Sequence, residues 1–180
     1  MRSEEKSSGV YAHFTVRIPA SVRVDLNREA KRRHITPNSL INAVLAKYMS
    51  FDKILEATKA IPVSEALFER WLAITSLEEM EDIAKSLGPK VVRQSFAFQG
   101  LEFNLDNLVE DYFEPLAEHS GWYQYNSRFE SGRRKLIFTH SHGPKWTAFL
   151  KRYHTALLRA ATGSEPEVMM EDEMLTFTCR

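Results

Sequence analysis

A short amphipathic strand near the N-terminus constrains the fold of this chain more than any other segment. Residues 13–18 read HFTVRI, with polar and apolar side chains in alternation, and Pro19 ends the pattern. Successive side chains of a strand point to opposite faces, so the apolar side needs a sheet to cover it. A lone strand also leaves its backbone N–H and C=O groups unpaired. The chain therefore has to find a partner for this strand.

Two helices are expected directly after the strand. An apolar residue recurs every four positions after Pro19, which predicts one helical stripe. The residues of this stripe are Val22, Leu26 and Ala30. Further on, TPNS predicts the start of a second helix, with Thr36 as N-cap and Pro37 at the first helical position. The turn between them reads RHIT without glycine, so His34 or a neighbour has to adopt a strained backbone conformation.

The strand and its two helices are too short to form a stable core in one copy. Below roughly 40 residues a domain usually needs a staple or a partner. Two copies of the strand paired antiparallel, with four helices covering the apolar side, would meet this need. We therefore expect residues 12–50 to form an intertwined homodimer.

In this order of elements, the segment resembles the ribbon-helix-helix family of DNA-binding proteins, of the Arc and MetJ type. The resemblance covers residues 12–50 and depends on HFTVRIP, on the helix register that follows, and on TPNS. It implies a transcriptional regulator, expected to be a repressor, that reads the major groove of a palindromic operator in double-stranded DNA with a two-stranded ribbon.

A disordered arm is expected before this segment, over residues 1–11.

Burial of the apolar strand side chains places His13, Thr15 and Arg17 on the opposite face of the ribbon. Arg17 can contact guanine with two hydrogen bonds, worth roughly 1–3 kcal/mol of discrimination. Thr15 can bond a base edge or touch a thymine methyl group, and His13 can donate or accept. The resemblance implies that these three positions read bases.

The start of the second helix is the second predicted contact with DNA. Its free backbone N–H groups and the positive end of the helix dipole attract anions. Thr36, Asn38 and Ser39 carry small polar groups there, and the resemblance implies a phosphate clamp that sets register rather than sequence preference. The charge distribution agrees, because residues 1–50 hold nine Lys and Arg against four Asp and Glu, while the remainder has an excess of five acids.

Residues 51–90 are expected to be a helical linker. Ser64 and Ser76 are candidate N-caps, and Glu79 completes a capping box with Ser76. Gly88-Pro89 is expected to end the segment.

Residues 91–180 are expected to form a ferredoxin-like domain with the order β-α-β-β-α-β. VVRQSFAFQ at 91–99 predicts its first strand. The following helix has Asn104 as cap, and Pro115 is expected to kink or split it near its end. Two strands joined through Ser131-Gly132 form a hairpin. The second helix has Pro144 at its start and Gly163 after its end, and EMLTFTCR is the last strand. The fold class is therefore α+β, with a C-terminal domain for sensing or oligomerisation.

No catalytic, metal or cofactor site is predicted. His140 and His142 are two residues apart on a predicted strand, as two metal ligands would be, and the outline resembles the nickel-responsive ribbon-helix-helix repressors. However, no third ligand lies near them, so we predict no metal. The sequence also has no glycine-rich phosphate loop and no GxSxG or HExxH motif, so we expect no enzyme.

The expected assembly is a homodimer, or a tetramer built from it through the C-terminal domain. With one cysteine, Cys179, no internal disulfide forms, and the expected location is the cytoplasm, without membrane contact. A small-molecule effector for the C-terminal domain is left open. Two alternatives also stay open: an antitoxin that binds its toxin through the C-terminal domain, and an interaction module that does not bind DNA.

Overall fold

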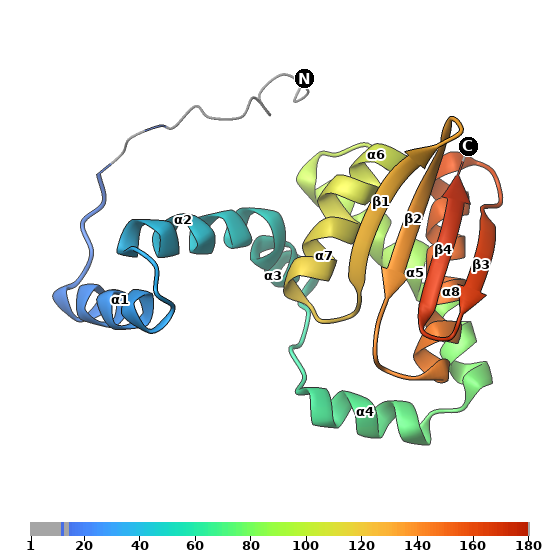
Figure 1. Cartoon of the computed structure of the whole chain (residues 1–180), viewed down its shortest axis with the longest axis horizontal. Helices are drawn as coiled ribbons and strands as arrows, with labels where there is room; N and C mark the ends of the chain where they lie inside the picture. The colour runs from blue at the N-terminus through green and yellow to red at the C-terminus, as the bar shows by residue number, and fades with distance from the viewer. Residues whose placement is uncertain (1–11, 13–14, 180) are drawn as a thin grey trace. The chain divides into compact units, whose positions relative to one another are not determined.

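The structure, a computed structural model, describes residue 12 and residues 15–179 (Figure 1). It divides into two compact units, Met1–Leu45 and Ala46–Arg180. The division falls inside the second helix, ahead of the boundary expected after residue 50. We refer to them as the smaller and the larger unit.

The smaller unit contains the two expected helices, α1 (Ala20–Arg32) and α2 (Pro37–Lys47). The turn between them has His34 at φ 55°, so the strained conformation expected there is confirmed. The N–H of Ile35 donates to the Ala30 carbonyl at 3.0 Å and so closes the end of α1. Residues 15–19 form neither helix nor strand in the single chain. Since a ribbon needs a second copy, the predicted strand stays a prediction.

The larger unit begins with a π-helical turn, η1 (Tyr48–Asp52), and two short helices, α3 (Lys53–Thr58) and α4 (Glu65–Ile74). Ser64 caps α4, as expected, by accepting the N–H of Leu67. The C-terminal end of α4 is capped by Lys145, whose Nζ donates to the carbonyls of Leu72, Ala73 and Thr75 at 2.8–3.0 Å.

The next helix, α5 (Leu77–Gln99), corrects two expectations. It begins with the predicted capping box of Ser76 and Glu79, but it continues through Gly88-Pro89. The strand predicted at 91–99 is wrong, because this segment forms the last turns of α5. The boundary expected between a linker over 51–90 and a domain over 91–180 therefore lies within one helix.

The physical reason is a buried stripe that runs the length of α5 and packs on α8 (Pro144–Thr162). Its members are Met80, Ala84, Gly88, Val92, Ser95 and Phe96. A Cβ atom at Gly88 would lie 2.9 Å from the Tyr153 ring, so this glycine permits close packing of the two helices rather than ending α5. Pro89 removes one helical hydrogen bond, which costs about 3 kcal/mol or more in a helix interior. Packing along the stripe offsets that loss.

A broken helix follows, made of α6 (Leu105–Leu108), the π-helical turn η2 (Val109–Phe113) and α7 (Glu114–His119). Asn104 is its N-cap, as expected, and accepts the N–H of Asn107 at 2.9 Å. The predicted break near Pro115 is confirmed as the π-helical turn just before it, because proline has no N–H to continue the ladder.

The sheet has the order β1-β2-β4-β3, and all neighbours are antiparallel. Its strands are β1 (Gln124–Glu130), β2 (Arg133–Thr139), β3 (Glu167–Glu171) and β4 (Met174–Cys179). The expected hairpin is confirmed, with Ser131 and Gly132 at φ 53° and 74°. The expected helix α8 is also confirmed; Gly163 follows its end at φ 73°.

The order β-α-β-β-α-β is nevertheless wrong. The sheet has four strands, as expected, but residues 91–99 are not one of them. In their place the sheet contains β3, which was not expected from the sequence and which pairs with β4. The larger unit is therefore a β-hairpin, a helix and a second β-hairpin, preceded by helices. The α+β class is correct.

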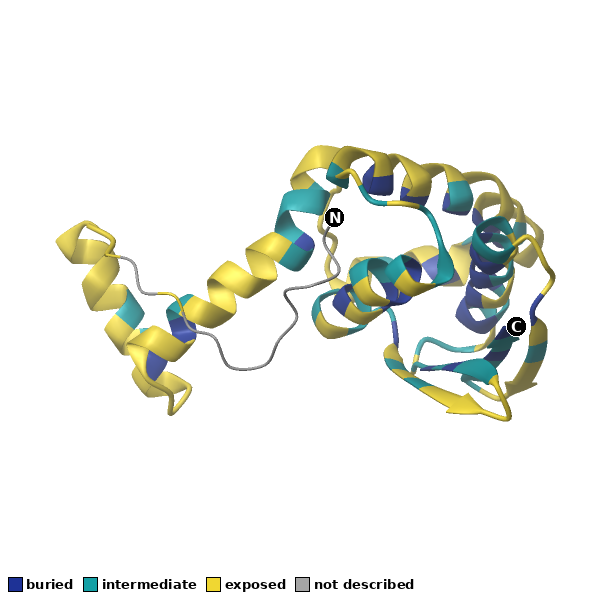
Figure 2. Ribbon diagram, turned by 90° about the horizontal axis from the view of Figure 1, so that it is seen from above, coloured by how far each residue is buried: buried dark blue, intermediate teal, exposed yellow. Residues whose placement is uncertain are grey.

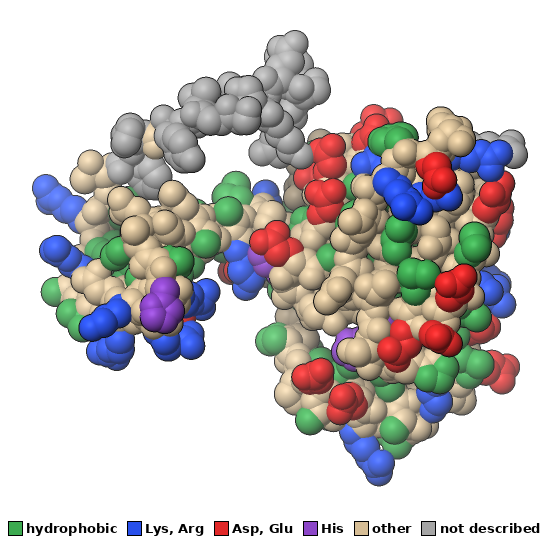
Figure 3. Space-filling model, viewed as in Figure 1, with side chains coloured by type: hydrophobic (Ala, Val, Ile, Leu, Met, Phe, Trp, Pro, Cys, Tyr) green, Lys and Arg blue, Asp and Glu red, His purple; other side chains and the backbone are tan. Residues whose placement is uncertain are grey.

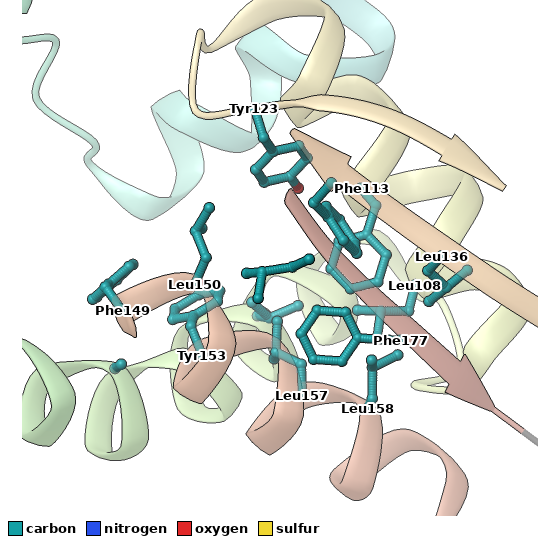
Figure 4. Packing of buried hydrophobic residues seen from close by; sticks show 14 of the residues in the cluster. Leu108, Phe113, Tyr123, Leu136, Phe149, Leu150, Tyr153, Leu157, Leu158 and Phe177 are labelled. Carbon is teal, nitrogen blue, oxygen red and sulfur yellow. The ribbon is translucent and has the colours of Figure 1, made fainter. Parts of the chain in front are cut away.

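The core of the larger unit lies between the sheet and the helices, which cover one face of it (Figures 1 and 2). Figure 4 shows Phe113, Leu157 and Phe177 pointing toward one another from η2, α8 and β4. His154 is fully buried among these aromatic rings and stacks on Phe138 with 4.3 Å between ring centroids. α5 packs on α8, so it forms the layer farther from the sheet.

Candidate nucleic-acid interface

The predicted base-reading residues lie in the extended segment before α1. Thr15 and Arg17 are exposed, and His13 lies outside the described residues. The apolar residues between and after them, Val16 and Ile18, are 59% and 42% exposed. The single chain therefore covers neither side of this segment.

Most residues of the smaller unit are exposed (Figure 2), and they include most of its large apolar side chains. Its exposed apolar residues are Val16, Ile18, Val22, Val24, Ile35, Val44 and Leu45, each at least 41% exposed. We call this set the apolar surface of the smaller unit. Among its described hydrophobic residues, only Ala30 and Leu40 are buried. A unit this small with so much exposed apolar surface is typical of one that requires a partner.

The predicted phosphate-binding residues meet at the start of α2. The N–H of Ser39 donates to Thr36 Oγ1 at 3.0 Å, and the two hydroxyl oxygens are 2.8 Å apart. Leu40 donates to the Thr36 carbonyl, and Pro37 has no N–H. Within the described part of the chain, the Asn38 N–H is therefore the amide of this first turn that has no partner. All three predicted residues are exposed.

Basic side chains are frequent on the surface of the smaller unit (Figure 3), and most of them belong to α1. Arg32 and Arg33 both bind the Glu29 carboxylate, at 2.6 and 2.5 Å. Their hydrogen bonds lower the pKa of Glu29 to about 2, so Glu29 stays charged and neutralises one of the two. Arg17, Arg23 and Lys31 form no ion pair among the residues that the structure describes.

The Glu29 ion pairs were not expected from the sequence. The spacing i to i+3 and i to i+4 between Glu29 and the two arginines is the signal that would have found them.

The histidine pair of the larger unit does not lie on a strand, because β2 ends at Thr139. His140 accepts the N–H of His142 at Nδ1, and its Nε2 lies 3.2 Å from Thr147 Oγ1, so both ring nitrogens are engaged. Burial lowers the pKa of His140. His142 donates from Nε2 to the Gly121 carbonyl at 3.0 Å.

Both histidines line a pocket of about 400 Å³ between the end of α7 and the β1-β2 hairpin. Over the described range, no group of three or more His, Cys, Asp and Glu residues could hold a metal ion. The hydrogen bonds give the pair a structural function: they join the segment after β2 to α8 and to the α7–β1 loop.

No known family model, curated protein or solved structure matches this chain. In addition, no helix within the described residues is long and apolar enough to cross a membrane.

Proposed function

We propose that this protein is a homodimeric, sequence-specific DNA-binding transcriptional regulator, and that it acts as a repressor. In this proposal, residues 13–18 of two copies form an antiparallel ribbon in the major groove of a palindromic operator. The larger unit senses a ligand, extends the assembly, or does both.

The apolar surface of the smaller unit is the observation that carries the proposal. Burying a large aliphatic side chain contributes roughly 1.5–3 kcal/mol, and Val16 and Ile18 are both largely exposed in the single chain. Antiparallel pairing of two copies would satisfy the backbone groups of residues 15–18 and place these side chains on α1 and α2. The same pairing turns Thr15 and Arg17 outward, as alternation along a strand requires.

Arg17 is exposed and forms no ion pair with any residue that the structure describes, which supports its assigned function. A guanidinium without an intramolecular partner keeps its donors for a guanine edge. The start of α2 supports a phosphate contact of modest strength, since one free amide and two small hydroxyl groups are present there.

The test compares Arg17→Ala with Arg23→Ala, a matched control that removes an exposed arginine from α1. Wild type and both variants are used to select binding sites from random duplex DNA at physiological salt. Their affinities for the selected site and for unrelated DNA are then measured. We expect Arg17→Ala to lose about 5- to 150-fold on the selected site, which corresponds to 1–3 kcal/mol, and far less on unrelated DNA.

Arg23→Ala should weaken binding to both DNAs alike, because a phosphate contact carries no sequence information. If Arg17→Ala behaves like Arg23→Ala, the base-reading assignment is wrong. If wild type binds no duplex DNA, the proposed function itself fails.

A further inference from the structure

A second side of α5 carries an apolar stripe that the larger unit leaves partly exposed. Four side chains at positions i, i+4, i+8 and i+15 form it, and we call them the α5 stripe: Ile83 (38% exposed), Leu87 (49%), Val91 (41%) and Phe98 (66%). Gln94 occupies the remaining position, i+11. This stripe borders the buried one, which packs on α8. The apolar surface of α5 is therefore wider than the part that α8 covers, which is typical of a helix with a further packing partner.

The charges along α5 indicate which partner fits the stripe. The first half of the helix carries four acids, Glu78, Glu79, Glu81 and Asp82, and one base, Lys85, whereas the second half carries Lys90 and Arg93. Glu79 is held in the capping box and Glu81 pairs with Arg152, so they contribute mainly to the net charge of this half. Reversing the helix thus exchanges its acidic and basic halves. A second α5 laid antiparallel brings opposite charges together, whereas a parallel one brings acid to acid.

The helix dipoles favour the same arrangement, because antiparallel packing places each positive end beside a negative end. At 3.6 residues per turn, Lys90 flanks the α5 stripe, whereas Asp82 lies on the other side of the helix. Within the described residues Lys90 forms no ion pair, so it remains available to a partner on the stripe. Arg93 donates to the Ala160 carbonyl and lies over the Phe103 ring. It can therefore contribute its charge to the contact but not a bidentate hydrogen bond.

We propose that the α5 stripe packs antiparallel against the α5 stripe of a second copy of this chain, about a two-fold axis at Leu87. Ile83 and Val91 are equally far from Leu87 along the helix, so this register places each Ile83 on the Val91 of the other copy. A two-fold contact of this kind uses the same surface on both copies. The contact concerns the larger unit alone and does not depend on DNA binding.

Single cysteines introduced into the full chain, treated with a short thiol-to-thiol cross-linker, test the register. The native Cys179 is 4% exposed, and burial raises its pKa to about 11, so it should not compete. Wild type, treated in the same way, is the control for cross-linking through Cys179. We expect Leu87→Cys to cross-link to itself, because only a residue on the axis meets its own copy. Ser86→Cys, the adjacent exposed position, should not.

Mixed samples decide the direction of packing. Ile83→Cys and Val91→Cys should each fail to cross-link alone, but should cross-link to one another when the two variants are co-expressed with different tags. Self-cross-linking of Ile83→Cys and Val91→Cys, each alone, would indicate parallel packing and overturn the proposal. A complete absence of cross-links would show that something else covers the stripe, and would overturn it too.

Sedimentation of the Leu87→Glu variant, compared with Ser86→Glu, measures self-association independently of cross-linking. Leu87 is not a core residue. A charge at the centre of the contact should weaken self-association by about tenfold or more, and the control should leave it unchanged. Equal association of both variants contradicts the proposal. Selection of DNA sites with the same two variants separates a failure of the proposed α5 contact from a failure of the proposed DNA binding.

Discussion

At the scale of single residues, His154 is the clearest departure from ordinary core chemistry. Its side chain is fully buried, and neither ring nitrogen has a hydrogen-bond partner among the residues that the structure describes. Burial lowers its pKa from the ordinary 6.5 to about 3, so it is neutral in the folded state. A buried polar group without a partner costs about 1–3 kcal/mol. His154 is thus a weak point of an otherwise apolar core.

This burial predicts a pH dependence of stability. Between pH 6.5 and about 3, the unfolded chain binds a proton at His154 that the folded chain does not. The free energy of unfolding should therefore fall as the pH falls through this range, with a contribution of roughly 1.4 kcal/mol per pH unit.

His154→Leu removes that contribution and should raise stability at pH 7 by about 1–2 kcal/mol. Urea unfolding at several pH values between 4 and 7 measures both effects. A destabilised variant with an unchanged pH slope would mean that the ring nitrogens are satisfied after all.

At the scale of secondary-structure elements, the contact of α5 with α8 depends on Gly88. In an exposed helix, replacing glycine with alanine stabilises by about 1 kcal/mol. At Gly88 the new methyl group would lie 2.9 Å from the Tyr153 ring, whose hydroxyl is held 2.7 Å from that of Tyr112. The ring cannot withdraw freely, so the steric effect should exceed the gain in helix propensity.

We therefore expect Gly88→Ala to lower the free energy of unfolding by about 1–3 kcal/mol. Ser86→Ala, on the exposed side of the same helix, is the control and should be neutral or slightly stabilising. Chemical denaturation of both variants checks the sign, and a stabilised Gly88→Ala would show that α5 and α8 are not packed this closely.

At the scale of the whole molecule, the proposed assembly depends on burying the apolar surface of the smaller unit. Ile18→Asp places a charge where two copies are expected to meet, so it should abolish both assembly through the smaller unit and binding to the operator. Thr15→Asp adds the same charge on the opposite side of the segment. It should leave assembly intact and weaken DNA binding alone, because the added carboxylate repels phosphate.

Sedimentation together with an operator-binding assay distinguishes the two variants. To isolate the smaller unit, both are measured in a Leu87→Glu background, which removes the contact proposed for α5. Assembly unaffected by Ile18→Asp would mean that the apolar surface packs on something other than a second copy.

The sequence by itself determined the features whose causes lie within a few residues. The caps at Thr36, Ser76 and Asn104 and the break before Pro115 appear in the structure as expected, because their hydrogen bonds and steric limits are local. The same holds for the turn at His34 and for Thr36 and Ser39, which meet at the predicted clamp.

Only the tertiary structure decided what depends on distant partners. VVRQSFAFQ has the composition of a strand, yet α8 offers a surface for a helical stripe, so the segment continues α5. β3 is mostly exposed, and its sequence has little of the alternation that predicts a strand. It forms a strand because β4 pairs with it. Nothing in the local sequence distinguishes His154 from its neighbours on α8. Its environment comes from rings on η2, β2 and β4 and from Tyr123 in the loop before β1. Such features follow from packing between segments far apart in the chain, where the free energy of burial exceeds local preference.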